Sequence, residues 1–229
     1  MTRDDAPALV PDPQPHDAAH GARLVVLISG GGSNLAALLA ACEEPGYGAQ
    51  VVAVGADRFT AGGLALAQER GIPTFVTRVG DFAERTEWDE ALTEQVSEYR
   101  PDLVISAGFL KLVGAAFLAQ FGGRYLNTHN SLLPAFPGMQ APADALAHGV
   151  KVAGATLFVV DAGVDAGPII AQTAVPVLDE DDVETLTERI KVAERAQLVD
   201  VVGRMARHGW VVRDRRVTIG APHPHGGLA

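Results

Sequence analysis

An amide and an imidazole lie two positions apart near the middle of the chain, at Asn127 and His129. On an extended chain, residues two apart point to the same side, so these side chains would project together while Thr128 faces away. Such a pair can polarise a carbonyl, stabilise the oxyanion formed when an amine attacks it, and move a proton near neutral pH. A histidine between a strand and a loop is more often structural, so the pair alone leaves both interpretations open.

A glycine-rich segment later in the chain, residues 161–168, holds two carboxylates, Asp161 and Asp165. A carboxylate beside His129 would favour the charged imidazolium, fix the orientation of the ring and hold a water for proton transfer. The alternative is that Asp161 caps a turn and Asp165 is solvated. The sequence does not show whether the two loops meet.

Three consecutive glycines, Gly30–Gly32, precede Ser33 and Asn34 where an apolar run gives way to a helical pattern. Glycine lets the backbone approach a ligand closely, and the N–H groups at a helix start can bind an anion. The loop therefore predicts a phosphate site, with a tight turn capped by Ser33 or Asn34 as the alternative. A dinucleotide fingerprint needs a third glycine where Leu35 stands, which disfavours a nicotinamide cofactor. Asp57 is a candidate ribose ligand, but its spacing from the glycine loop in the sequence is long.

The candidate residues lie in a segment of the chain where predicted strands and helices alternate. Continuous apolar runs at Arg23–Ser29, Gln50–Val54 and Leu103–Ser106 predict strands buried on both faces. Their alternation with helical patterns indicates an α/β fold, a Rossmann-like, mostly parallel twisted sheet flanked by helices. The other expected elements are helices at Ser33–Cys42, Ala61–Arg70, Glu84–Tyr99, Leu112–Gln120 and Asp182–His208, strands at Thr74–Thr77, Tyr125–His129, Ala153–Asp161 and Ile169–Leu178, and a hairpin of Trp210–Arg213 with Arg216–Ile219.

The 229 residues carry a formal net charge of −10, which argues against a protein that wraps nucleic acid but not against a small phosphorylated substrate. The single cysteine, Cys42, allows neither an internal disulfide nor a multi-thiolate metal site. No apolar run suits a signal sequence or a membrane span, so we expect a cytoplasmic protein. We further expect a disordered leader at 1–22, one domain at 23–220 and a disordered tail at 221–229.

Taken together and in order, these motifs resemble the folate-dependent formyltransferases, and within them the enzymes that act on glycinamide ribonucleotide in de novo purine biosynthesis. The resemblance runs from Arg23 to Gly220. It implies transfer of the formyl group of 10-formyltetrahydrofolate to the amine of 5-phosphoribosylglycinamide, giving N-formylglycinamide ribonucleotide and tetrahydrofolate. The matching segments are Gly30–Leu35, Ala107–Lys111, Asn127-x-His129 with Ser131–Pro134, and Asp165-x-Gly167-Pro168.

The resemblance also implies roles for individual residues. Asn127 would contact the formyl group and stabilise the oxyanion, and His129 would act as general acid or electrostatic stabiliser. Asp165 would favour the imidazolium of His129 and organise the proton-carrying water. The N-terminal half would bind the ribonucleotide and the C-terminal half the folate, without a metal; a homodimer is compatible with the pattern. The implied ribonucleotide contacts are Gly32, Ser33, Asn34 and Glu194, and the implied folate contacts are Arg85, Leu110, Lys111, Leu112, Val113 and Asn127.

Three positions depart from the family's pattern: Asn130 stands where proline is usual, and Gln140 and Phe158 stand where histidine is usual. The residues at Asn127, His129 and Asp165 are unaffected. The three departures therefore concern ligand contacts and the rate more than the type of reaction. The alternatives are a methionyl-tRNA or nucleotide-sugar formyltransferase, a formyltetrahydrofolate hydrolase, a non-catalytic nucleotide-binding regulator and an NAD-dependent oxidoreductase. The length and the acidic charge disfavour the tRNA enzyme and the hydrolase, each of which would need a further domain.

Overall fold

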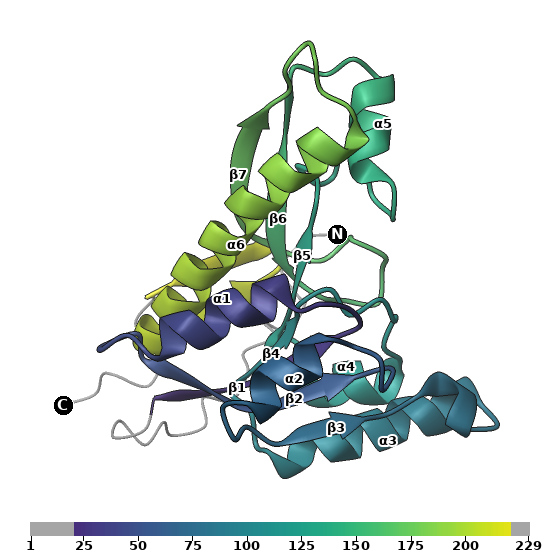
Figure 1. Cartoon of the computed structure of the whole chain (residues 1–229). Coiled ribbons are helices and arrows are strands. Elements are labelled where there is room, and N and C mark those ends of the chain that lie inside the picture. Colours follow the sequence, from purple (N-terminus) through teal and green to yellow (C-terminus); the bar gives the residue numbers. More distant parts are fainter. Residues whose placement is uncertain (1–20, 221–229) are drawn as a thin grey trace, which may run out of the picture.

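The computed structural model describes residues 21–220, and Figure 1 shows a twisted sheet with helices on both faces. The main sheet has seven strands in the order β3-β2-β1-β4-β5-β6-β7. The first five strands in this order run parallel, whereas β6 and β7 are antiparallel to their neighbours. The predicted α/β fold with a mostly parallel sheet is confirmed. The strands are β1 (Ala22–Ile28), β2 (Ala49–Ala56), β3 (Thr74–Val76), β4 (Leu103–Ser106), β5 (Tyr125–His129), β6 (Val152–Val159) and β7 (Ile169–Pro176).

Helices bury the two faces of the sheet because the central strands are apolar on both sides. In β1, Leu24, Val26 and Ile28 face one core, whereas Val25 and Leu27 face the other. Helices α1, α2 and α6 cover the first core, and α3 and α4 cover the second. The helices are α1 (Ser33–Cys42), α2 (Gly63–Gln68), α3 (Arg85–Glu98), α4 (Ala115–Phe121), α5 (Ala141–Ala147) and α6 (Val183–His208), with a short 3₁₀ turn η1 at Val79–Asp81.

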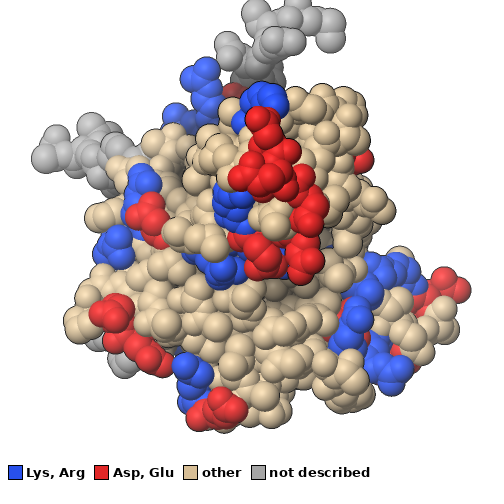
Figure 2. Space-filling view, turned by 45° about the horizontal axis from the view of Figure 1, so that its top comes forward, with Lys and Arg blue, Asp and Glu red and all other residues tan. Residues whose placement is uncertain are grey.

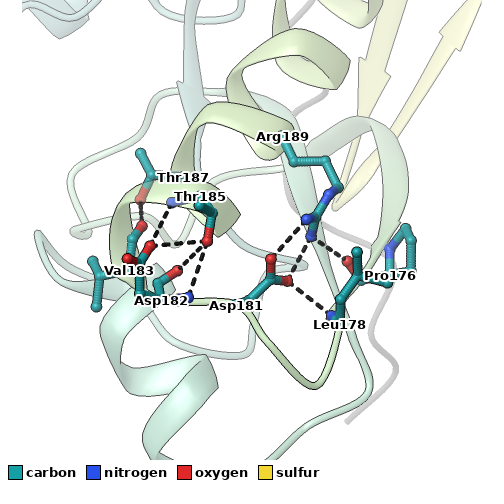
Figure 3. Close-up of polar contacts among 8 residues, drawn as sticks. All are labelled: Pro176, Leu178, Asp181, Asp182, Val183, Thr185, Thr187 and Arg189. Atoms are coloured by element: carbon teal, nitrogen blue, oxygen red, sulfur yellow. Dashed lines mark hydrogen bonds and ion pairs between the residues drawn. The ribbon is translucent and has the colours of Figure 1, made fainter.

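The long helix α6 begins at a capping box (Figure 3). The Asp182 carboxylate accepts from the Thr185 amide at 2.8 Å, and the Thr185 hydroxyl accepts from the Asp182 amide at 2.9 Å. Beside it, the guanidinium of Arg189 donates two hydrogen bonds of 2.6 Å to Asp181, and these lower the pKa of Asp181 to about 2. The cap therefore sets where α6 starts and which of its residues face the sheet.

Two helices differ most from the sequence prediction, and α2 (Gly63–Gln68) is shorter at both ends than the predicted Ala61–Arg70. Helix α4 begins at Ala115 and not at Leu112, because the buried Asp89 carboxylate caps it from α3 by accepting the amides of Ala116 and Phe117. The preceding residues are left outside the helix as a consequence. Helix α5 was not predicted, although Pro142 in its first turn is a recognised start signal.

The described residues run from 21 to 220, next to the expected bounds of the domain at 23 and 220. The first strand begins at Ala22, inside the expected leader, where it pairs with Ala49. The expected hairpin is confirmed as β8 (Trp210–Arg213) and β9 (Arg216–Ile219). The predicted disorder of the two tails concerns 1–20 and 221–229, which lie outside the described residues. Within the described part, no helix combines the length and apolar character needed to cross a membrane.

Candidate active site

The candidate residues gather where the neighbouring parallel strands β1, β4 and β5 end. The sheet extends from β1 toward β2 and β3 on one side and toward β4 and β5 on the other, and open α/β sheets bind ligands at such a reversal of strand order. The loop Gly30–Gly32 follows β1, the segment Ala107–Val113 follows β4, and the loop Asn130–Gly138 follows β5.

The glycine loop leaves the start of α1 open. Gly32 is the N-cap with φ of 77°, and a Cβ there would lie 2.9 Å from the Cα of Gly63. Only glycine fits this left-handed, closely packed position. Among residues 21–220, no side chain caps the helix, and its N-cap is Gly32, so the expected alternative of a cap by Ser33 or Asn34 is wrong. The first amides of α1 therefore lack both helical and side-chain acceptors, which suits an anion.

A buried carboxylate from α6 meets this helix start. Glu194 is 5% exposed, and its Oε1 accepts from the Asn34 amide at 2.6 Å and the Thr128 hydroxyl at 3.0 Å. Its second oxygen, Oε2, is buried and has no hydrogen-bond partner among residues 21–220. Buried polar atoms are nearly always paired, so this oxygen is available to a donor on a ligand.

Strand β5 separates two sets of side chains as predicted. Thr128 points to α6, and Asn127 and His129 point to the other side of the sheet. The side-chain amide of Asn127 forms no hydrogen bond with another residue of the described chain. The ring of His129 is nearly buried, and its Nε2 lies 2.9 Å from the Phe136 carbonyl oxygen. Because a carbonyl only accepts, Nε2 carries a hydrogen and donates it to this carbonyl, and Nδ1 is left for other partners.

The structure brings the two predicted loops together at His129. Its Nδ1 lies 3.6 Å from Oδ2 of Asp165, which also accepts from the Gly138 amide at 2.8 Å. At this separation the ring and the carboxylate face each other without a direct hydrogen bond. Asp165 is thus not solvated: its side chain is 13% exposed. Asp161 caps a turn by accepting the Gly163 amide at 2.9 Å, as in the alternative interpretation.

The segment Leu110–Val113 is held at its start by a buried cluster. The Leu110 amide donates to Ser29 Oγ at 2.9 Å, and Lys111 Nζ pairs with Asp57 at 3.1 Å. Burial by itself raises the pKa of Asp57, but hydrogen bonds from Arg58, Lys111 and Ser29 outweigh it and lower that pKa to about 2. The Asp57 carboxylate is therefore already paired with these groups and is not free to bind a ribose. Lys111, whose folate contact was predicted to be largely through the backbone, has its ammonium engaged in this cluster.

The other end of the segment is held by α3. Arg85 stacks over the Trp88 ring at 4.2 Å and donates to the Leu112 carbonyl, while Asp89 accepts the Gly114 amide. The side chains of Leu110 and Leu112 are left 55% and 66% exposed. The result is a stretch of backbone that is fixed at both ends and carries exposed apolar side chains.

Sequence reasoning missed Asp57 and Asp89 as supports of this segment. The sequence carries a signal for each of them: Asp57 directly follows a buried parallel strand, and Asp89 lies on the apolar face of α3 with Leu92 and Val96. A carboxylate in either place has to be paired, because burying an unpaired charge is costly. The structure shows that both pair with the segment after β4.

The three departures leave the central contacts in place. Phe158 is 1% exposed and lies opposite Asn127 on β6, where it fills the sheet face beside the amide. Gln140 is exposed at the N-cap position of α5, and Asn130 directly follows β5. Within residues 21–220, no group of three or more His, Cys, Asp or Glu side chains is arranged to hold a metal ion.

Comparison with known proteins connects this geometry to one family. The sequence profile described as "Formyl transferase" matches residues 22–202. The chain is 54% identical over 199 residues to a phosphoribosylglycinamide formyltransferase of Mycobacterium tuberculosis (strain ATCC 25618 / H37Rv), spanning 87% of this chain and 92% of the relative. It is 44% identical over 173 residues to the human trifunctional purine biosynthetic protein adenosine-3, spanning 76% of this chain and 17% of that protein. The crystal structure of glycinamide ribonucleotide transformylase 1 from Symbiobacterium toebii aligns with a TM-score of 0.84 at 45% identity, covering 87% of this chain and 94% of that one.

Proposed function

Because this chain belongs to the formyl transferase family, we propose that it transfers the formyl group of 10-formyltetrahydrofolate to the amine of 5-phosphoribosylglycinamide. The products are N-formylglycinamide ribonucleotide and tetrahydrofolate, in purine biosynthesis. The observation that carries the proposal is the convergence of Asn127, His129 and Asp165 between an uncapped helix start and the exposed segment Leu110–Val113. Two relatives that match this chain over 92% and 94% of their own length are named for the same acceptor, and this supports the proposal.

The ribonucleotide binds on the α1 side of β5. Its phosphate accepts from the amides that follow Gly32, with the Ser33 and Asn34 side chains as further donors. A ribose hydroxyl donates to the unpartnered Oε2 of Glu194. Basic side chains lie among acidic ones on the face in Figure 2, without forming one continuous basic stripe. Local donors therefore hold the phosphate in a protein of net charge −10.

The folate binds on the other side, along the segment Leu110–Val113. Its ring stacks on the exposed apolar side chains and bonds the backbone, which the Ser29 and Asp89 contacts hold in place. Arg85 borders this segment at Leu112 and is the cationic group available to the anionic part of the folate. Lys111 contributes through its backbone, because its ammonium is paired with Asp57.

Chemistry takes place at Asn127 and His129. The acceptor nitrogen attacks the formyl carbon, the C=O electron pair moves to oxygen, and the tetrahedral intermediate collapses as the bond to N10 breaks. The Asn127 amide donates to the developing oxyanion, and the protonated His129 adds positive charge beside it. A water between His129 Nδ1 and Asp165 carries the amine proton toward N10. No nucleophile from the protein is required.

Tetrahydrofolate release, measured with and without the ribonucleotide acceptor, tests the proposal. We expect release that depends on the acceptor, and Asn127→Ala, His129→Ala and Asp165→Ala should each lose about 10²–10³ in kcat, the usual effect of removing one oxyanion donor. His208→Ala is the matched control, because His208 is an exposed histidine at the C-terminal end of α6. Acceptor-independent release would indicate a hydrolase, and no release a binding protein. Near-normal turnover of the His129 variant would overturn the mechanism.

A further inference from the structure

The C-terminal hairpin reaches the loop that carries Asp165. Strands β8 and β9, yellow in Figure 1, lie beyond residues 22–202, which the family profile matches. At their turn, Nη2 of Arg215 donates to the Ala166 carbonyl at 2.7 Å and to the Gly167 carbonyl at 3.3 Å. These are the two residues that follow Asp165. One guanidinium thus joins the end of the chain to the candidate catalytic loop.

The hairpin that carries Arg215 is itself fixed to the domain. Val212 is 2% exposed and belongs to the core shared with α6, and Val217 and Ile219 pack against that core. The indole of Trp210 donates to the Gly123 carbonyl at 2.9 Å. Because both strands contact the rest of the domain, the turn that carries Arg215 is held in a fixed position.

The Asp165 loop needs such support because its backbone is strained. Asp165 has φ of 50°, in the left-handed region that non-glycine residues rarely adopt. A conformation of this kind persists only where surrounding contacts hold it. After it, the chain passes so close to β6 that a Cβ on Gly167 would lie 1.7 Å from the Val159 carbonyl oxygen. The Gly138 amide holds the carboxylate, and Arg215 holds the backbone just beyond it.

We propose that Arg215 is a positioning residue for formyl transfer: by holding the Ala166 and Gly167 carbonyls, it keeps the Asp165 carboxylate facing Nδ1 of His129. This inference rests on the proposed function. Both hydrogen bonds come from the single nitrogen Nη2, whose two hydrogens can serve the two carbonyls. Arg215 contacts no residue assigned to either substrate, so its loss affects the chemical step and leaves substrate binding unchanged.

The test is steady-state kinetics of Arg215→Ala, with Arg216→Ala as the matched control. Arg216 is an exposed arginine in the same hairpin, and no residue of the described chain forms a hydrogen bond or ion pair with its side chain. We expect kcat of Arg215→Ala to fall about tenfold, equivalent to ~1.4 kcal/mol, with both KM values and the melting temperature unchanged. Arg215→Lys should recover part of the rate, and the control should match the wild type.

A double-mutant cycle separates positioning from general destabilisation. If Arg215 acts through Asp165, then Arg215→Ala should cost little more in a chain that already carries Asp165→Asn. An equal loss in both backgrounds, a raised KM, or an unchanged kcat would each overturn the inference. An inactive wild-type protein would contradict the proposed function instead, so the two failures are distinguishable.

Discussion

Replacing Asp57 by Asn removes a charge from the cluster that holds the start of the folate-side segment, with little change of shape. The Asp57 side chain is 1% exposed and pairs with Arg58 at 2.7 Å and Lys111 at 3.1 Å. An amide cannot pair with both cations, so Lys111 is left partly buried without its anion. We expect lower stability and a higher KM for the formyl donor, with the KM for the ribonucleotide unchanged.

The size of the stability loss follows from the pKa of Asp57. Folding lowers this pKa from 3.8 to about 2, and at ~1.36 kcal/mol per pKa unit the charged carboxylate contributes roughly 2–3 kcal/mol to the free energy of unfolding. Because the folded-state pKa of Asp57 is the lower one, this contribution is complete well above pH 3.8 and is lost as the pH falls through 2. The side chain is buried, so solvent screening removes little of it.

Urea unfolding at a series of pH values measures the effect. We expect Asp57→Asn to lower the free energy of unfolding by roughly 2–3 kcal/mol at pH 7 and by about half as much near pH 3. Asp200→Asn is the control: its exposed carboxylate lies 3.5 Å from Arg204, and such surface pairs contribute about 0–1 kcal/mol. A cost for Asp57→Asn that does not change with pH, or that equals the control, would refute the reasoning.

Three further changes test other parts of the structure. Glu194→Gln keeps an acceptor for Asn34 but replaces the unpartnered oxygen by a donor, so the KM for the ribonucleotide should rise about tenfold, and an unchanged KM contradicts the assignment. Burial raises the pKa of the Cys42 thiol to about 11, so a thiol-specific reagent at pH 8 should label the unfolded chain and spare the native one; equal labelling rates would be inconsistent with burial. Asp89→Asn loses charge-assisted bonds to the start of α4, and fluorescence of Trp88 should report loosening there, together with a raised KM for the formyl donor and not for the acceptor.

The predictions that held depend on short-range patterns. Apolar runs such as Leu103–Ser106 predict buried parallel strands, and alternation along β5 places Asn127 and His129 on one side and Thr128 on the other. Helix α5 was missed despite its local signal at Pro142, whereas the error at α4 arises where a distant side chain acts on the backbone. The start of α4 moved from Leu112 to Ala115 because Asp89, on another helix, caps it. Residue spacing carries no information on such a contact.

The amino-acid pattern alone specifies the α/β class, the positions of the glycine loop and of the Asn127–His129 pair, and the kind of chemistry they suit, because periodicity and side-chain chemistry are local properties. Only the tertiary structure decided which groups meet. The crossing of α6 over the sheet brings Glu194 to Asn34, 160 positions away in the chain. The path of the loop after β6 places Asp165 beside His129. Such encounters depend on how whole elements pack against the sheet, and no single segment of the chain encodes that packing.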